Sequence, residues 1–459
     1  MHKCKQRGCN EYNNLSRRQF MGVGAATAAA AGAPMWLPRV AFADGPTDRD
    51  VLITIFLRGG ADSLTMCVPH GDNHYYSLRP TLNIPRPDSG SADACTDIDG
   101  FFGIPKPMKS LKTAYNQGDL LYVHATGTPD ESRSHFQAEY VTEIGKELDA
   151  SVFTGWIGRH LTTSSPANPN AILRAVGINS ALQRSLIGSP LALPIPNLSD
   201  FGIEGWWETV DERMAALAAM YEQGPVDLQI TAANTITTFN TLNAIDFENY
   251  APSNDAVYPD SWFAQSMKSA AALIKSGIGV EAICSDIGGW DTHADQQPRE
   301  GYMADLMQEV ADTLSAFHAD MKDDSTKNYI VVVMSEFGRI CFENATAGTD
   351  HGHGGLMMLL GNNIDGGRVL TIWPGLGDDD LFQGQDLQIT IDYRDILAEI
   401  VQYRLGNSNL TTVFPDYTPV FRGAVSSVTA ASISFAGATG WTVGAFGPRD
   451  GNSQYFAVV

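Results

Sequence analysis

The chain has 459 residues, of which 44% are hydrophobic and 18% are charged, as in an ordinary globular protein. Its formal net charge of −22 argues against nucleic-acid binding, because so acidic a surface cannot neutralise a phosphate backbone. The charge does not exclude an anionic substrate, since a bound cation can invert the local field at a site.

Residues 1–43 have the features of an export signal. Paired Arg17 and Arg18 precede an alanine-rich, weakly apolar run, and "AFA" at 41–43 has the small residues of a cleavage site. The run is too short to cross a membrane, and we expect no transmembrane helix in the mature chain. The pattern predicts export by the twin-arginine machinery to the periplasm or the extracellular space.

Buried strands are predicted at Val51–Leu57, at 119–127, and within 279–293 and 328–339. Each is a continuous apolar run, which is typical of a strand covered on both faces. Helical patterns lie between these runs, for example at 301–321. Alternating strands and helices predict an α/β domain with a mainly parallel sheet.

Two regions follow the signal. Residues 44–422 are expected to form the α/β domain, with a helical insertion at about 180–277. Residues 423–459 are rich in Ser, Thr, Ala and Gly with β-like alternation, which predicts a small β-rich tail. Cys67 and Cys95 could form a bridge outside the cytoplasm, although buried thiols are the simpler expectation.

Polar residues follow the predicted strands, where open α/β sheets bind their ligands. Asp62 follows the first strand, and Asp291 and His293 follow a later one. Alternate residues of an extended segment face the same way, so Asp291 and His293 could bind one metal ion. Glu336 ends the last of these strands and could be a ligand or the partner of Arg339.

The segment "GTDHGHGG", residues 348–355, places two histidines and an aspartate among glycines. His351 and His353 are two residues apart, as Asp291 and His293 are. Asp350 could be a ligand or could orient a histidine. Glycines let the backbone approach a bound ion closely. A glycine-rich turn with solvated histidines would give the same pattern.

A loop enters a predicted helix at Ser132 to His135. A serine there is often an N-cap, but the same place suits a nucleophile or an anion site, with Arg133 adjacent. Ser132 and Ser134 could therefore each serve as a cap, as a nucleophile or as part of an anion site. His135 could complete a metal shell.

These motifs together resemble a known family. "FLRGGADS", "DGFFGIPKPMKSL", "LLYVHATGTPDESRSHFQAE", "GGWDTHADQ", "VVVMSEFGR", "GTDHGHGG" and "TIDYRDILAEIV" occur in order from about Val51 to Phe421. The series resembles the domain of unknown function 1501 family, exported proteins similar to the alkaline phosphatase and sulfatase superfamily. The resemblance implies a doubly wound, alkaline-phosphatase-like sheet with one or two divalent ions at the strand ends. The implied ligands are Asp62, Asp291, His293, Glu336, His351 and His353.

One departure from the superfamily bears on the ion count. An Asp-His pair usually follows the late strand, whereas this chain has Glu336 and Phe337 there. A phenylalanine cannot bind metal, so a second ion would need His351, His353 or His135.

The resemblance favours a metal-dependent hydrolase of phosphate or sulfate esters, acting through a serine nucleophile or a metal-bound water. It implies Ser134 as that nucleophile, with Ser132 or Ser63 as alternatives. His351 or His353 would assist proton transfer, and Arg133 and Arg58 would hold an anionic ester, either a small molecule or a polymer. Mixed nitrogen and oxygen ligands favour Zn or Mn. The alternative is a non-catalytic exported protein of the same fold that contains metal and serves binding or assembly.

Overall fold

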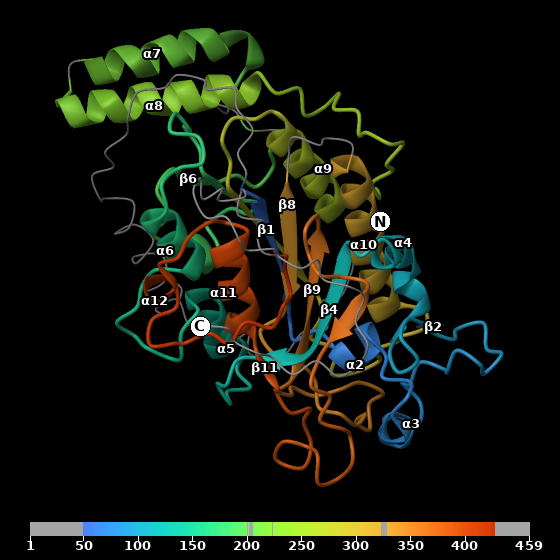
Figure 1. Cartoon of the computed structure of the whole chain (residues 1–459). Helices are drawn as coiled ribbons and strands as arrows, with labels where there is room; N and C mark the ends of the chain where they lie inside the picture. The colour runs from blue at the N-terminus through green and yellow to red at the C-terminus, as the bar shows by residue number, and fades with distance from the viewer. Residues whose placement is uncertain (1–48, 200, 202–204, 223, 323–327, 427–459) are drawn as a thin grey trace, which may run out of the picture. The chain divides into compact units, whose positions relative to one another are not determined.

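The computed structural model describes residues 49–199, 201, 205–222, 224–322 and 328–426 (Figure 1). All the described residues belong to one unit, which lies within Met1–Ser426. The expected export signal, and the expected tail beyond Ser426, lie outside the described residues. Within the described part, no helix has the length and apolar character needed to cross a bilayer.

One nine-stranded sheet forms the centre of the described structure, in the order β10-β4-β9-β8-β1-β7-β5-β6, with β11 paired to β4. Its strands are β1 (Val51–Arg58), β4 (Leu120–Gly127), β5 (Ala175–Gly177), β6 (Ala192–Pro194), β7 (Ala282–Gly288), β8 (Tyr329–Met334), β9 (Gly355–Gly361), β10 (Arg368–Leu370) and β11 (Ile391–Asp392). Only β9, of these strands, runs antiparallel to its neighbours, which are β4 and β8. A separate antiparallel pair consists of β2 (Thr96–Asp97) and β3 (Gly103–Ile104).

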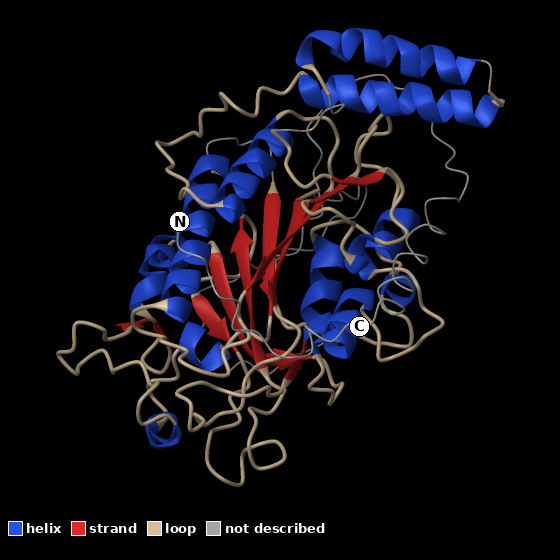
Figure 2. Ribbon diagram, turned by 180° about the vertical axis from the view of Figure 1, so that it is seen from behind, coloured by secondary structure: helices blue, strands red, loops and turns tan. Residues whose placement is uncertain are grey.

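Helices cover both faces of this sheet (Figures 1 and 2). One face packs on α9 (Trp262–Lys275) and α10 (Tyr302–Met321), and the other on α6 (Trp156–Thr163) and α11 (Tyr393–Tyr403). The other α-helices are α2 (Ser63–Met66), α3 (Asn73–Leu78), α4 (Lys112–Asn116), α5 (His135–Ile144), α7 (Val210–Glu222), α8 (Val226–Asn243) and α12 (Leu410–Val413). This arrangement confirms the expectation of a doubly wound, mainly parallel α/β sheet.

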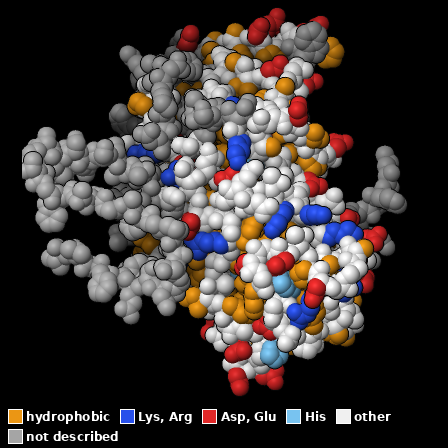
Figure 3. Space-filling model, turned by 45° about the vertical axis from the view of Figure 1, so that its right-hand side comes forward, with side chains coloured by type: hydrophobic (Ala, Val, Ile, Leu, Met, Phe, Trp, Pro, Cys, Tyr) orange, Lys and Arg blue, Asp and Glu red, His pale blue; other side chains and the backbone are white. Residues whose placement is uncertain are grey.

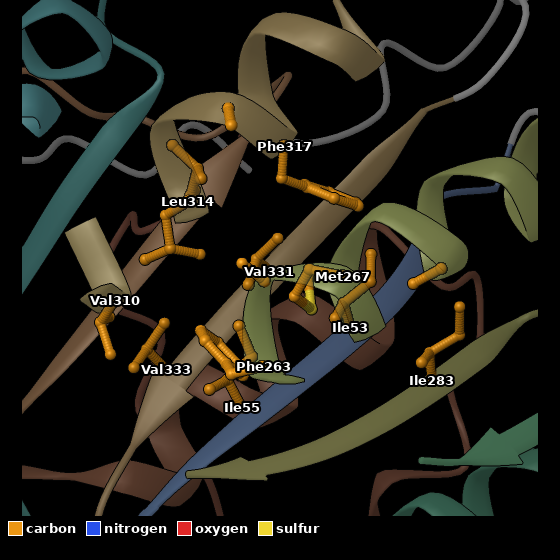
Figure 4. Close-up of a cluster of buried hydrophobic side chains, with 14 of the residues drawn as sticks. Ile53, Ile55, Phe263, Met267, Ile283, Val310, Leu314, Phe317, Val331 and Val333 are labelled. Carbon is orange, nitrogen blue, oxygen red and sulfur yellow. The ribbon is translucent and has the colours of Figure 1, made fainter. Parts of the chain in front are cut away.

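The core explains why β1 is apolar along its whole length. Ile53 and Ile55 point towards α9 and α10, where they join Phe263 and Leu314 in one buried cluster (Figure 4). Alternate residues of β1, such as Leu52, pack in the cluster on the opposite face. Successive side chains of a strand face opposite ways, so both sets must be apolar when helices cover both sides.

The predicted insertion, residues 180–277, contains helices in different surroundings. Helix α7 has no buried residue and packs against α8, and Figure 2 shows this helical hairpin at a distance from the sheet. Helix α9 instead buries most of its residues against the sheet. The four cysteines in the described part of the chain are free, buried thiols.

The described surface carries charges of both signs. On the face drawn in Figure 3, acidic and basic side chains alternate with apolar ones. The chain is acidic as a whole. A cation-binding site on this protein would therefore depend on a few particular side chains and not on a broad acidic patch.

Candidate metal site

Three chain segments meet at the carboxyl ends of the central strands. Asp291 lies three residues beyond β7, and Glu336 lies two residues beyond β8. His135 is the first residue of α5, which follows β4. Strands β1, β7 and β8 are parallel neighbours, so their carboxyl ends share one edge of the sheet.

Asp291 is the centre of this group. Its Oδ1 lies 3.0 Å from Nε2 of His293 and 3.0 Å from Nε2 of His351. Its Oδ2 lies 3.6 Å from Nε2 of His135. The side chain of His135 is fully buried, whereas that of His293 is 35% exposed, so the group reaches from the interior to the surface.

Each of the three histidines is held at its other ring nitrogen by an oxygen acceptor. His135 Nδ1 donates to Glu336 Oε1 at 2.7 Å. His351 Nδ1 donates to the backbone carbonyl of Arg133 at 2.7 Å, and His293 Nδ1 donates to Asp350 at 2.6 Å. A carbonyl or carboxylate oxygen can only accept, so the proton of each neutral imidazole is on Nδ1. Each Nε2 is then left as a lone-pair donor facing Asp291.

This arrangement requires a positive charge at its centre. Nε2 of His293 and Nε2 of His351 are 3.0 Å apart, and both face a carboxylate oxygen. Lone pairs at such distances repel unless a proton or a metal ion lies among them. Two nitrogen ligands of a tetrahedral zinc ion lie about 3.3 Å apart, given Zn–N distances of about 2.0–2.1 Å. The donor atoms of His135, Asp291 and His351 all lie within 4.8 Å of one another, so these residues fit a divalent ion.

The pKa values of the histidines and of Asp291 are shifted by the charges that these side chains place on one another. Burial opposes the charge of His135, but hydrogen bonds to Asp291 and Glu336 outweigh it and raise its pKa to about 10. The hydrogen bond to Asp291 likewise raises the pKa of His293. Burial would raise the pKa of Asp291, but the three histidines and Arg339 hold it well below its usual range. The carboxylates of this site therefore favour a cation in their midst, whether a proton or a metal ion.

The glycines of the loop 348–355 allow its close packing. A Cβ at Gly348 would collide with the backbone of His293, and one at Gly352 would collide with the backbone of Arg339. The loop can therefore lie directly on the two segments that carry the other site residues. This contact brings His351 to Asp291.

Arg339 holds the carboxylate of Asp291 in place. Its guanidinium is fully buried and donates to Asp291 Oδ1 at 2.7 Å. It also donates to the backbone carbonyls of Gly59, Gly60, Trp290 and Thr349. The sequence suggested Arg339 as a partner of Glu336, whereas the structure pairs it with Asp291.

Asp62, predicted as a ligand, has a different environment. Its buried carboxylate accepts from Arg79 at 2.5 Å, from Thr65 at 2.6 Å and from Gln296 at 2.7 Å, all on Oδ2. Burial would raise the pKa of Asp62, but the charge of Arg79 outweighs this and lowers it. The structure does not place Asp62 among the residues that surround Asp291.

The remaining predicted residues border the site. Ser134 is the N-cap residue of α5, but its hydroxyl makes no capping hydrogen bond. The side chain of Arg133 pairs with Asp386, so only its backbone carbonyl serves the histidine group. His353 stacks on Phe382, with ring centroids 4.4 Å apart, and is not among the histidines that face Asp291.

The part that His135 plays in this group could not be predicted from the sequence alone. The sequence indicates His135 only as a residue that could complete a metal shell, whereas the structure places its fully buried side chain against Asp291 and Glu336. Its position beside Ser134, at the start of a helix that follows a buried strand, was the available signal. Nothing in the sequence indicated that Glu336, 201 residues away, would hold its Nδ1.

Comparisons with known proteins give a family and two distant structural similarities. The family described as a protein of unknown function (DUF1501) matches residues 112–410. A sulfatase, PsFucS1, from Pseudoalteromonas sp. is 12% identical with a TM-score of 0.30, and the match covers 90% of this chain and 78% of that one. The C-terminal periplasmic domain of EcEptC from Escherichia coli, in complex with Zn, is 10% identical with a TM-score of 0.28, covering 86% of this chain and 95% of that one. No curated protein matches the sequence.

Proposed function

Because this chain belongs to the DUF1501 family of proteins of unknown function, its activity has to be argued from its own residues, and we propose that it is a metal-dependent hydrolase of phosphate or sulfate esters. The observation that carries this proposal is the set of three imidazoles whose Nδ1 atoms are held by oxygen acceptors. Their Nε2 atoms all face Asp291. That arrangement of donors is what a divalent ion requires, and nitrogen-rich ligands favour Zn or Mn.

A divalent ion bound there would lower the pKa of an attacking hydroxyl and neutralise charge on the departing oxygen. The chain's own groups would prepare the rest. Glu336, Asp350 and the carbonyl of Arg133 orient the three imidazoles, and Arg339 fixes Asp291.

Ser134 is the proposed nucleophile. It directly precedes His135, and its hydroxyl is not used as a helix cap. The first turn of α5 leaves backbone N–H groups without helical partners, and such groups bind anions such as a phosphate or sulfate. His353 is the proposed proton acceptor. Burial and the charge of Arg133 lower its pKa to about 4, so at pH 7 its ring is neutral and can accept a proton, but it is a weaker base than an ordinary histidine.

A non-catalytic binding protein of the same fold is the second candidate, and the state of two arginines favours it. The guanidinium of Arg133 is paired with Asp386. Arg58 is paired with Glu139, Glu143 and Asp286. Neither expected clamp has its charge available for an anionic substrate unless these pairs separate.

The cellular setting is also proposed. The paired arginines and the "AFA" site near the start of the sequence support twin-arginine export to the periplasm or beyond. The substrate would then be an anionic ester met outside the cytoplasm, either a small molecule or a group on a polymer. The acidity of the chain argues against a nucleic-acid partner on electrostatic grounds.

Turnover of an aryl phosphate and an aryl sulfate by the zinc-loaded and manganese-loaded protein tests the proposal. We expect Asp291→Asn to abolish turnover and Ser134→Ala to lower it by at least 100-fold, as for loss of a nucleophile. Ser132→Ala, in the same loop, is the matched control and should change it little. If Ser134→Ala keeps full activity while Asp291→Asn is inactive, water and not Ser134 is the nucleophile. Metal binding without turnover of either ester would favour the binding protein.

A further inference from the structure

Asp62 and Arg79 form a buried ion pair at the end of β1. Both side chains have no exposed surface, and Arg79 Nη1 donates to Asp62 Oδ2 at 2.5 Å. Arg79 is anchored by two further hydrogen bonds to the carbonyls of Ile340 and Cys341. The pair is therefore fixed by backbone contacts and carries no net charge.

A second ion would need ligands other than Asp291 and the three histidines that face it. His353 stacks on Phe382 and lies in the field of Arg133, which disfavours a nearby cation. Glu336 Oε1 accepts from His135 and from the backbone of Gly59, and its Oε2 accepts from Ser335. Glu336 is therefore already engaged by His135, Gly59 and Ser335, and the ring of His353 lies outside the group of histidines that face Asp291.

Phe337 occupies the space next to the histidines. Its ring centroid lies 5.0 Å from that of His135 and 4.9 Å from that of His351, and its side chain is buried. An apolar ring in this place excludes water and any ligand atom from that side of the imidazoles. Among the described residues, His135, Asp291 and His351 form the one group of acidic, histidine or cysteine side chains that could hold a metal ion.

We propose, on the basis of the metal site described above, that the protein binds a single divalent ion, and that Arg79 gives Asp62 the positive charge that a second ion would otherwise give. The guanidinium is a permanent, always ionised substitute for a metal ion. The chain thereby keeps a buried aspartate at the end of β1 without a second metal shell.

One oxygen of Asp62 bears on this proposal. Oδ1 is buried and has no hydrogen-bond partner among the described residues. A zinc or manganese ion needs four or more ligands, and one oxygen beside a guanidinium does not provide them. One buried water molecule is enough to donate a hydrogen bond to a buried carboxylate oxygen of this kind.

Titration of the metal-free, full-length protein with Co²⁺, followed by visible absorption, tests the ion count without measuring activity. We expect the absorbance to stop rising at one equivalent per chain. A break at two equivalents overturns the single-ion proposal but leaves the proposed hydrolase intact. An absence of any bound Co²⁺ overturns both.

Two matched variants assign the ion to its residues. Asp291→Asn and Asp62→Asn make the same change in two buried aspartates that are each paired with a buried arginine. We expect Asp291→Asn to lose at least 100-fold in Co²⁺ affinity and Asp62→Asn to keep one equivalent. Loss of the ion in Asp62→Asn but not in Asp291→Asn contradicts the assignment. If Asp62→Asn does not fold, Thr65→Val weakens the same pair, and loss of the ion there has the same meaning.

Discussion

Two buried aspartates at neighbouring strand ends differ in what surrounds them. Asp62 follows β1 and Asp291 follows β7, and each is paired with a fully buried arginine, at 2.5 Å and 2.7 Å. Around Asp62 the further donors are the neutral side chains of Thr65 and Gln296. Around Asp291 they are three imidazoles.

The difference separates a structural ion pair from a candidate metal site. Hydroxyl and amide groups do not ionise at physiological pH, so they remain hydrogen-bond donors to a carboxylate. Imidazoles can release a proton and present a lone pair to a metal ion instead. A buried Asp–Arg pair is therefore weak evidence of function until its other neighbours are known.

The largest expected effect is on stability, and it should be greater at Asp62. Asp62→Ala leaves the buried Arg79 without its carboxylate, and breaking a buried pair in this way costs about 3–5 kcal/mol. Asp291→Ala in the metal-free protein should cost less, because Arg339 keeps four backbone carbonyls as partners. Urea unfolding of both metal-free variants measures this. An equal loss of unfolding free energy in the two variants, or a larger loss in Asp291→Ala, would contradict the greater contribution of the Asp62–Arg79 pair to stability.

The second effect is stabilisation by metal, and it should depend on Asp291 and not on Asp62. Zn²⁺ at a free concentration of 1,000 times its Kd should raise the free energy of unfolding by about 4 kcal/mol. Adding a chelator should remove this gain in the wild type and in Asp62→Asn. Asp291→Asn should show no gain in Tm with Zn²⁺. A full gain in that variant would place the ion elsewhere.

The smallest expected effect concerns the carboxylates that orient the histidines. Glu336→Gln and Asp350→Asn should each weaken Zn²⁺ binding by about 10–100-fold, which is the usual range for such outer partners. Glu336 is fully buried, whereas the side chain of Asp350 is 51% exposed, so we expect the larger loss at Glu336. Competition with a zinc chelator gives both values, with Asp305→Asn on α10 as a surface control. Unchanged affinity in Glu336→Gln would show that His135 is not a ligand.

Much of the fold could be predicted because apolar runs report burial directly. The run expected at Val51–Leu57 became β1, and the helical pattern at 301–321 became α10 (Tyr302–Met321). The direction of β9 could not be predicted, since an apolar strand reads the same whichever way it runs. Its antiparallel pairing with β4 and β8 depends on the path of the loop before it.

By itself, the sequence determined which residue types stand at the strand ends, and it identified the family. Asp62 and Asp291 have similar local contexts, "GGAD" and "GGWD", so no local pattern could tell them apart. Only the tertiary structure decided between them, by bringing Arg79 and Gln296 to one and three histidines to the other. The physical reason is that ionisation and metal binding depend on charges within a few ångströms, and here those charges come from distant parts of the chain.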